Sequence, residues 1–94
     1  MNKSDRDYLD AVIRDGCVLC EYLGFGQSPA EVHHQRTGTG AARRANHRQV
    51  AALCPRHHRL GPVAFHVMGR KAFERHHGIT ELELIEMTAR RVVG

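Results

Sequence analysis

The chain is short and basic, and both properties limit what it can do. Its 94 residues hold 14 Lys and Arg against 10 Asp and Glu, with 3 Cys and no Trp. A chain of this length forms one small domain, here residues 1–94, whose modest core often needs a metal for stability. No apolar stretch suits a signal peptide or a membrane span. The odd number of cysteines does not fit a disulfide framework, so we expect a soluble cytoplasmic protein.

The acidic residues avoid the middle of the sequence. Every Asp and Glu lies at or before Glu31 or at or after Glu74. The stretch between them carries eight Lys and Arg residues and six of the eight histidines. A basic segment flanked by acids indicates a polyanionic partner, most simply nucleic acid, although a solvated basic loop has the same composition.

The first predicted element is a short helix from Ser4 to Gly16. Ser4 is a suitable N-cap, and Gly16 is a suitable end. Leu9, Val12 and Ile13 share one face of such a helix, which is therefore expected to pack against the core.

Two pairs of metal-binding residues have matching spacing. Cys17 and Cys20 form one pair, and Cys54 and His57 form the other. Each pair can bend around one ion, and together they supply three thiolates and one imidazole, a complete tetrahedral set for Zn²⁺. The alternative is that three small cysteines are buried and bind no metal. We expect a structural zinc that stabilises the fold.

The pattern in the basic middle of the chain predicts two strands followed by a helix. Residues 24–29 form a turn, 30–34 a short strand, and 49–53 a second strand that pairs with the first. Pro55 suits the first position of the following helix, which Gly61-Pro62 ends.

Two more helices are predicted after this unit. One runs over residues 70–77 and ends at Gly78. Thr80 and Glu83 form a capping box that opens a terminal helix. The expected buried face of that helix comprises Leu82, Ile85, Ala89 and Val92.

Several histidines are left over once the zinc set is complete. His33 and His34 are neighbours on a strand and point to opposite faces, so one can bind a metal while the other faces a substrate. On the helix, His57 and His58 diverge by about 100°. If His57 completes the zinc site, His58 points toward the first strand. The pattern predicts a closed zinc site and an open site with His58, a strand histidine and His66.

These residues resemble the HNH endonucleases, which have a ββα-metal (His-Me finger) fold. The sequence is most similar to the small phage and prophage branch related to the RecA-dependent nuclease of a temperate phage. The shared positions are His33, His34, His47, the run 53–58, the segment 65–74 and Gly78. The resemblance spans roughly residues 17–78. It implies a small α+β fold, with a ββα-metal core, flanking helices and a structural zinc.

The resemblance also implies a role for each matching histidine. His34 is the general base that deprotonates the attacking water. His33 and His58 are ligands of a catalytic metal, and His66 is a weaker candidate for a third ligand.

The middle residue of the HNH motif departs from the family pattern. It is usually Asn, but in this sequence His47 occupies the position and Asn46 precedes it. The family residue orients the loop or the base through a hydrogen bond, which His47 can also make through one ring nitrogen. Either Asn46 or His47 can therefore fill the role.

Phosphodiester hydrolysis needs these residue types. Water attacks phosphorus in line, and a histidine can take its proton near neutral pH. A cation neutralises the charge that grows on the phosphate and on the leaving 3′ oxygen. Arginines clamp neighbouring phosphates. The candidates for DNA contact are Arg36, Arg43, Arg44 and Arg48.

The lack of acids from Val32 to Phe73 also restricts the catalytic metal. Mg²⁺ prefers oxygen ligands, whereas imidazole suits transition metals. An imidazole site can use Mg²⁺ only with oxygens borrowed from phosphate and water. We therefore expect Mn²⁺, Ni²⁺ or Co²⁺ to serve at least as well as Mg²⁺.

The sequence thus predicts a metal-dependent DNA endonuclease of HNH type, acting in phage recombination or DNA processing inside a bacterial host. The expected partners are DNA and a recombination protein such as RecA, with no membrane. Two alternatives need no catalysis: a zinc-stabilised nucleic-acid-binding module that uses the arginines alone, and a protein–protein adaptor built on a zinc knuckle. The leftover histidines favour the nuclease, because a binding module needs no imidazole base beside an open metal position.

Overall fold

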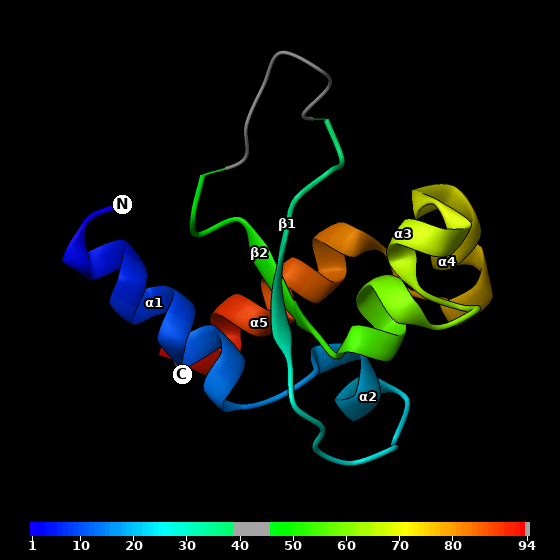
Figure 1. Ribbon diagram of the computed structural model, residues 1–94, viewed down its shortest axis with the longest axis horizontal. Helices are drawn as coiled ribbons and strands as arrows, with labels where there is room; N and C mark the ends of the chain where they lie inside the picture. Colours follow the sequence, from blue (N-terminus) through cyan, green and yellow to red (C-terminus); the bar gives the residue numbers. More distant parts are fainter. Residues whose placement is uncertain (39–45, 94) are drawn as a thin grey trace.

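The computed structural model describes residues 1–38 and 46–93, which form a small α+β fold around a two-stranded sheet (Figure 1). The elements in chain order are α1 (Lys3–Arg14), α2 (Val18–Tyr22), β1 (Glu31–His34), β2 (Val50–Leu53), the π-helix η1 (Arg56–Leu60), α3 (Phe65–Met68), α4 (Arg70–His77) and α5 (Glu81–Val93). Among these described elements, no helix is long and apolar enough to cross a membrane.

The sheet is an antiparallel pair, with α5 behind it in the view of Figure 1. At one end of the ladder, Glu31 pairs with Leu53. β2 is buried along its whole length, because α1, α2 and α5 all pack against it. Successive side chains of β1 point to opposite faces of the sheet, so Glu31 and His33 share one face while Val32 and His34 share the other.

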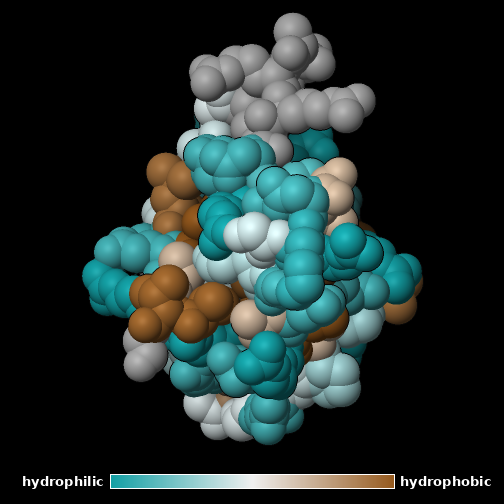
Figure 2. Space-filling view, turned by 90° about the vertical axis from the view of Figure 1, so that its left-hand side faces the viewer, coloured by the Kyte–Doolittle hydropathy of each residue, from teal (hydrophilic) through white to brown (hydrophobic). Residues whose placement is uncertain are grey.

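Two groups of buried apolar side chains hold these elements together. The larger group, with Leu19 and Phe73 among its members, joins α2 to β2, α3, α4 and α5. The smaller group packs Tyr8 and Val12 of α1 against β2. Hydrophilic side chains cover most of the face that includes α1, with small hydrophobic areas between them (Figure 2).

The first helix is confirmed, but its cap differs from the prediction. The Asn2 side chain, not that of Ser4, accepts a hydrogen bond from the Asp5 N–H at 2.8 Å. The helix therefore begins at Lys3, and the Ser4 hydroxyl accepts a hydrogen bond from Arg48 instead.

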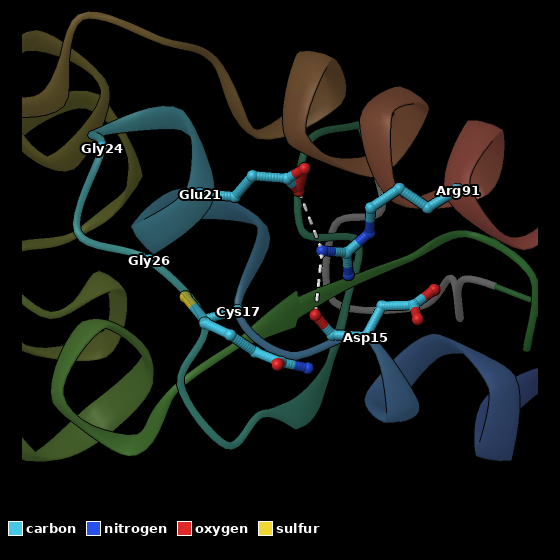
Figure 3. A pocket seen from close by; sticks show the side chains of 7 residues that line it. Asp15, Cys17, Glu21, Gly24, Gly26 and Arg91 are labelled. Carbon is cyan, nitrogen blue, oxygen red and sulfur yellow. Dashed lines mark hydrogen bonds and ion pairs between the residues drawn. The ribbon is translucent and has the colours of Figure 1, made fainter.

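Gly16 lies between α1 and the first metal-binding pair, at a place where only glycine fits. Its φ of +83° is left-handed, and a Cβ there would lie 2.6 Å from the carbonyl oxygen of Ser28. This close approach lets the Cys17 N–H donate to that oxygen at 2.9 Å. Arg91 of α5 closes the same junction, because it donates to Gly16 O at 2.8 Å. In the pocket drawn in Figure 3, it also donates to Glu21 at 3.1 Å and to the carbonyl oxygen of Asp15 at 3.4 Å.

The segment after β2 is helical as predicted, but its turn is wider than that of an α-helix. The Gly61 N–H bonds to Arg56 O at 3.2 Å, which is a π-helical step of five residues. Pro55 precedes this helix as its N-cap and is not its first residue. The short helix α3, which the sequence pattern did not predict, follows.

The terminal helix and its capping box are confirmed, and Ile85 and Val92 of the predicted face pack against the core, but the most deeply buried residues of the helix are others. The Glu83 N–H donates to Thr80 Oγ1 at 3.1 Å, and the Thr80 N–H donates to Glu83 Oε1 at 2.9 Å. Of the predicted face, Leu82 is 47% exposed, and the other three residues are half-buried. The residues that α5 buries are Glu81, Leu84 and Thr88. Two of these residues are polar, and each accepts a hydrogen bond from a backbone N–H. Thr88 accepts from the sheet, and Glu81 accepts from the loop after β1.

Candidate metal centre and active site

Four predicted ligands converge where α2, the end of β2 and η1 meet. Cys17, Cys20, Cys54 and His57 are all buried, and their ligand atoms lie within 4.8 Å of one another. The sulfurs of Cys20 and Cys54 are 3.8 Å apart. The Nδ1 atom of His57 lies 3.3–4.0 Å from the three sulfurs. We call this group the Cys₃His site, and its residues can hold a metal ion.

The spacing fits a tetrahedral ion bound by sulfur and nitrogen. With bonds of about 2.3 Å to sulfur and about 2.0 Å to nitrogen, a tetrahedron separates two sulfurs by about 3.8 Å and a sulfur from a nitrogen by about 3.5 Å. Burial raises the pKa of the Cys17 thiol to about 12, so a thiolate there requires a cation beside it. The Cys20 N–H donates to Cys17 Sγ at 3.4 Å, and Ser28 Oγ donates to Cys20 Sγ at 3.2 Å. Both donors favour negatively charged sulfur.

A second group consists of imidazoles alone. His33, His58 and His66 come from β1, η1 and α3, and their ligand atoms also lie within 4.8 Å of one another. The ring centroids are 4.9–5.4 Å apart. Burial, followed by the nearby His33 and His58, lowers the pKa of His66. Because His33 is buried and His66 is exposed, this three-histidine cluster is open on one side.

Two carboxylates that sequence reasoning missed contact these histidines. Glu31 Oε1 lies 2.8 Å from His58 Nδ1, and Glu81 Oε2 lies 2.6 Å from His33 Nε2. Hydrogen bonds from Arg59 and then from His58 lower the pKa of Glu31 to about 2. Burial acts to raise the pKa of Glu81, but hydrogen bonds from His33 and from the loop after it outweigh burial and lower this pKa to about 2. Both acids are therefore anionic near neutral pH.

On the other face of β1, His34 lies beside His47. Their ring centroids are 5.6 Å apart, and the ring planes meet at 73°. Partial burial of the His34 ring, and then the nearby His47 and His33, lower the pKa of His34 and keep the ring neutral at pH 7. The Asn46 side chain is used within its own turn, where it accepts a hydrogen bond from the Arg48 N–H at 2.8 Å. Of the two candidates for the middle position of the motif, His47 is the one whose ring lies next to His34.

The predicted DNA contacts have different surroundings. Arg36 is exposed in the loop after β1. Arg48 stacks over the Tyr8 ring of α1, with its guanidinium carbon 4.7 Å from the ring centroid, so it also holds α1 in place. Arg43 and Arg44 lie outside the described residues.

Comparison with known proteins identifies the family. The family described as "Recombination enhancement, RecA-dependent nuclease" matches residues 2–92, which is nearly the whole chain. No curated protein and no solved structure matches the chain. The family description supports nuclease activity, and dependence on RecA indicates DNA as the substrate. The chain thus belongs to the family of RecA-dependent nucleases of recombination enhancement.

Proposed function

We propose that the protein is a metal-dependent DNA endonuclease of the HNH type, with β1, β2 and η1 as its ββα-metal core. The observation that supports this most is the three-histidine cluster of His33, His58 and His66. His34 follows His33 directly on β1 and lies beside His47 on the other face of that strand. The family match adds nuclease activity and a link to RecA. A protein that only binds DNA has a use for the Cys₃His site, but it needs no second set of converging imidazoles.

The two groups of ligands are proposed to hold different ions. The closed Cys₃His site has the donors and the spacing of a structural Zn²⁺ site. The three-histidine cluster offers imidazole nitrogens, which suit Mn²⁺, Ni²⁺ or Co²⁺ at least as well as Mg²⁺. A divalent ion held by these three imidazoles would supply positive charge for the phosphate and the leaving 3′ oxygen.

His34 is the proposed general base. Its ring is neutral near pH 7, so an unprotonated ring nitrogen can accept the proton of the attacking water. The water oxygen bonds to phosphorus while the bond from phosphorus to the 3′ oxygen breaks, and the 3′ oxygen takes a proton from solvent. His47, beside this ring, is proposed to orient it. His33 and His58 are assigned to the metal and do not act as bases.

The loop between β1 and β2 is proposed to hold the DNA backbone. It starts directly after His34 and contains Arg36, Arg43, Arg44 and Arg48. Four arginines therefore follow the proposed base in sequence, and guanidinium groups bind phosphate through paired N–H donors.

Cleavage assays with the purified full chain test this function. Supercoiled plasmid and single-stranded circles are incubated with Mg²⁺, Mn²⁺, Ni²⁺ or EDTA, each with and without RecA and ATP. We expect nicked or linear products with at least one ion in the presence of RecA, and none in EDTA. DNA binding without cleavage under every condition would identify a zinc-stabilised binding module instead.

A further inference from the structure

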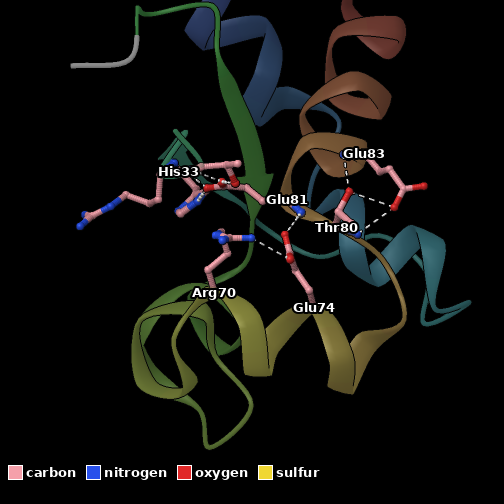
Figure 4. Close-up of polar contacts among 8 residues, drawn as sticks. His33, Arg70, Glu74, Thr80, Glu81 and Glu83 are labelled. Atoms are coloured by element: carbon pink, nitrogen blue, oxygen red, sulfur yellow. Dashed lines mark hydrogen bonds and ion pairs between the residues drawn. The ribbon is translucent and has the colours of Figure 1, made fainter. Parts of the chain in front are cut away.

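Glu81 is a buried acid at the start of α5, outside the span that the HNH resemblance covers. It is 1% exposed, and Figure 4 shows it reaching from α5 toward His33 on β1. Its backbone N–H donates to Glu74 of α4 at 2.8 Å, and Glu74 is in turn paired with Arg70 at 3.0 Å. The start of α5 is thereby fixed against both α4 and β1.

The two carboxylate oxygens of Glu81 are fully engaged. Oε1 accepts from the Thr37 N–H at 2.8 Å and from Thr37 Oγ1 at 2.6 Å. Oε2 accepts from the Arg36 N–H at 2.8 Å and lies 2.6 Å from His33 Nε2. Because an ionised carboxylate only accepts hydrogen bonds, His33 Nε2 carries the proton in this contact. The other ring nitrogen, Nδ1, is then unprotonated when the ring is neutral.

His33 Nδ1 is the atom that this arrangement leaves for a ligand. The atom is buried, and within the described part of the chain it has no hydrogen-bond partner. A buried nitrogen without a partner costs free energy. The His33 ring lies 5.2 Å from the His58 ring and 5.4 Å from the His66 ring, measured between centroids. A cation shared with those two rings would satisfy Nδ1.

We propose that Glu81 is a positioning residue for the catalytic metal, because it holds His33 in the tautomer that leaves Nδ1 free to bind the ion. From the proposed function, this inference takes only the binding of a metal ion by the three-histidine cluster. A carboxylate that accepts from the second nitrogen of a ligating histidine fixes the ring and raises its basicity. Glu31 contacts His58 Nδ1 in a similar way at 2.8 Å. The first residue of α5 is therefore a functional part of the active centre.

The test compares Glu81→Gln with Glu86→Gln, which changes an exposed acid on the same helix. Glutamine has one acceptor oxygen and one donor NH₂ group. In either orientation its NH₂ group faces the N–H of Arg36 or of Thr37, so the four hydrogen bonds cannot all be kept. With zinc in the Cys₃His site, titration calorimetry with Ni²⁺ is expected to show binding about 10–100-fold weaker for Glu81→Gln. Glu86→Gln should bind Ni²⁺ like the parent.

A measurement on the parent chain covers the case in which Glu81→Gln does not fold. Long-range ¹H–¹⁵N NMR reports which imidazole nitrogen carries the proton in each histidine. We expect His33 to be protonated at Nε2, and its Nδ1 resonance to shift when diamagnetic Cd²⁺ is added to the zinc-loaded protein. Protonation at Nδ1, or a folded Glu81→Gln that binds Ni²⁺ as tightly as the parent, would overturn the role of Glu81.

Neither readout depends on DNA cleavage, so the two proposals fail separately. A parent chain that cleaves DNA while Glu81→Gln keeps its Ni²⁺ affinity refutes the role of Glu81 alone. The opposite outcome is that His33 has the expected tautomer and Glu81→Gln binds Ni²⁺ more weakly, but the parent chain cleaves no DNA under any condition. That outcome refutes the nuclease and leaves Glu81 as a positioning residue of a metal site.

Discussion

His57 and His58 are neighbours in sequence but have different partners. His57 Nδ1 lies 3.3 Å from Cys54 Sγ, whereas His58 Nδ1 lies 2.8 Å from Glu31 on β1. Successive side chains on a helix point in different directions, so one residue faces the Cys₃His site and the other faces the three-histidine cluster. Substitutions at these two positions should therefore have different effects.

We expect His57→Ala to lose bound zinc and cooperative folding, because it opens a buried site on which the small core depends. His58→Ala should keep zinc and fold, while its Ni²⁺ affinity and its cleavage fall by amounts that vary with the ion supplied. Metal analysis, thermal melting and calorimetry measure these effects, with the exposed His76→Ala as control. Identical phenotypes for the two variants would contradict their assignment to separate sites.

The sequence predicted both groups of potential metal ligands, but not the carboxylates that contact the histidines among them. The strand period of two separates His33 from His34, as expected. The same period places Glu31 on the face of His33, a signal that is easily overlooked because Glu31 borders the acid-free stretch. Glu81 gave no such signal, since its contact with His33 joins distant parts of the chain and depends on how α5 packs.

At the level of elements, α5 buries a mixed face because its surroundings present backbone donors. Thr88 Oγ1 accepts from the Ala52 N–H of β2 at 3.3 Å, and Glu81 accepts from the Thr37 N–H at 2.8 Å. An apolar face here would leave such donors unpaired, at a cost of about 1–3 kcal/mol each. Hydrophobic pattern and capping residues therefore predicted the helix and its start, but they could not predict which side faces the sheet.

The rotation of α5 can be tested with two leucines. Leu84 is 1% exposed and Leu82 is 47% exposed. Leu84→Ala should lower the free energy of unfolding by about 2–5 kcal/mol, because it leaves a cavity in the core. Leu82→Ala should change it by less than about 0.5 kcal/mol. Denaturant unfolding of both zinc-loaded variants measures the difference, and a larger loss for Leu82→Ala would support the face that the hydrophobic pattern predicted.

At the scale of the whole molecule, one ion at the Cys₃His site would join segments that are distant in sequence. Its residues come from α2 and the residue before it, from the residue directly after β2, and from η1. Binding of structural zinc contributes about 10–16 kcal/mol to folding in zinc-finger peptides. This is large compared with the stability that a core of this size supplies by itself.

Complete removal of zinc is therefore expected to abolish the cooperative thermal transition, and adding zinc back should restore it. Circular dichroism melts of the same sample before chelation, after it and after reconstitution measure this effect. Removal of a weakly bound second ion should leave the transition almost unchanged. A zinc-free chain that melts at the parent temperature would show that the apolar core is sufficient.

The loop between β1 and β2 should control DNA affinity without sequence preference. Neutralising Arg43 and Arg44 to Gln is expected to weaken binding to all sequences alike. The slope of log affinity against log salt concentration should flatten by about 0.9 for each duplex phosphate that an arginine no longer neutralises. The control is Arg90→Gln on α5, an exposed arginine paired with Glu86. A salt slope equal to that of the parent would place the DNA surface elsewhere.

Cleavage by His34→Ala decides whether this chain is an enzyme that uses an imidazole base. His34 is exposed and belongs to neither metal group, so the variant should keep zinc, Ni²⁺ affinity, fold and DNA binding. RecA-dependent cleavage should fall by about 10²–10⁴-fold, the usual effect of a missing general base, and added imidazole should restore part of it. His34→Ala protein that cleaves DNA at the parent rate would contradict the mechanism.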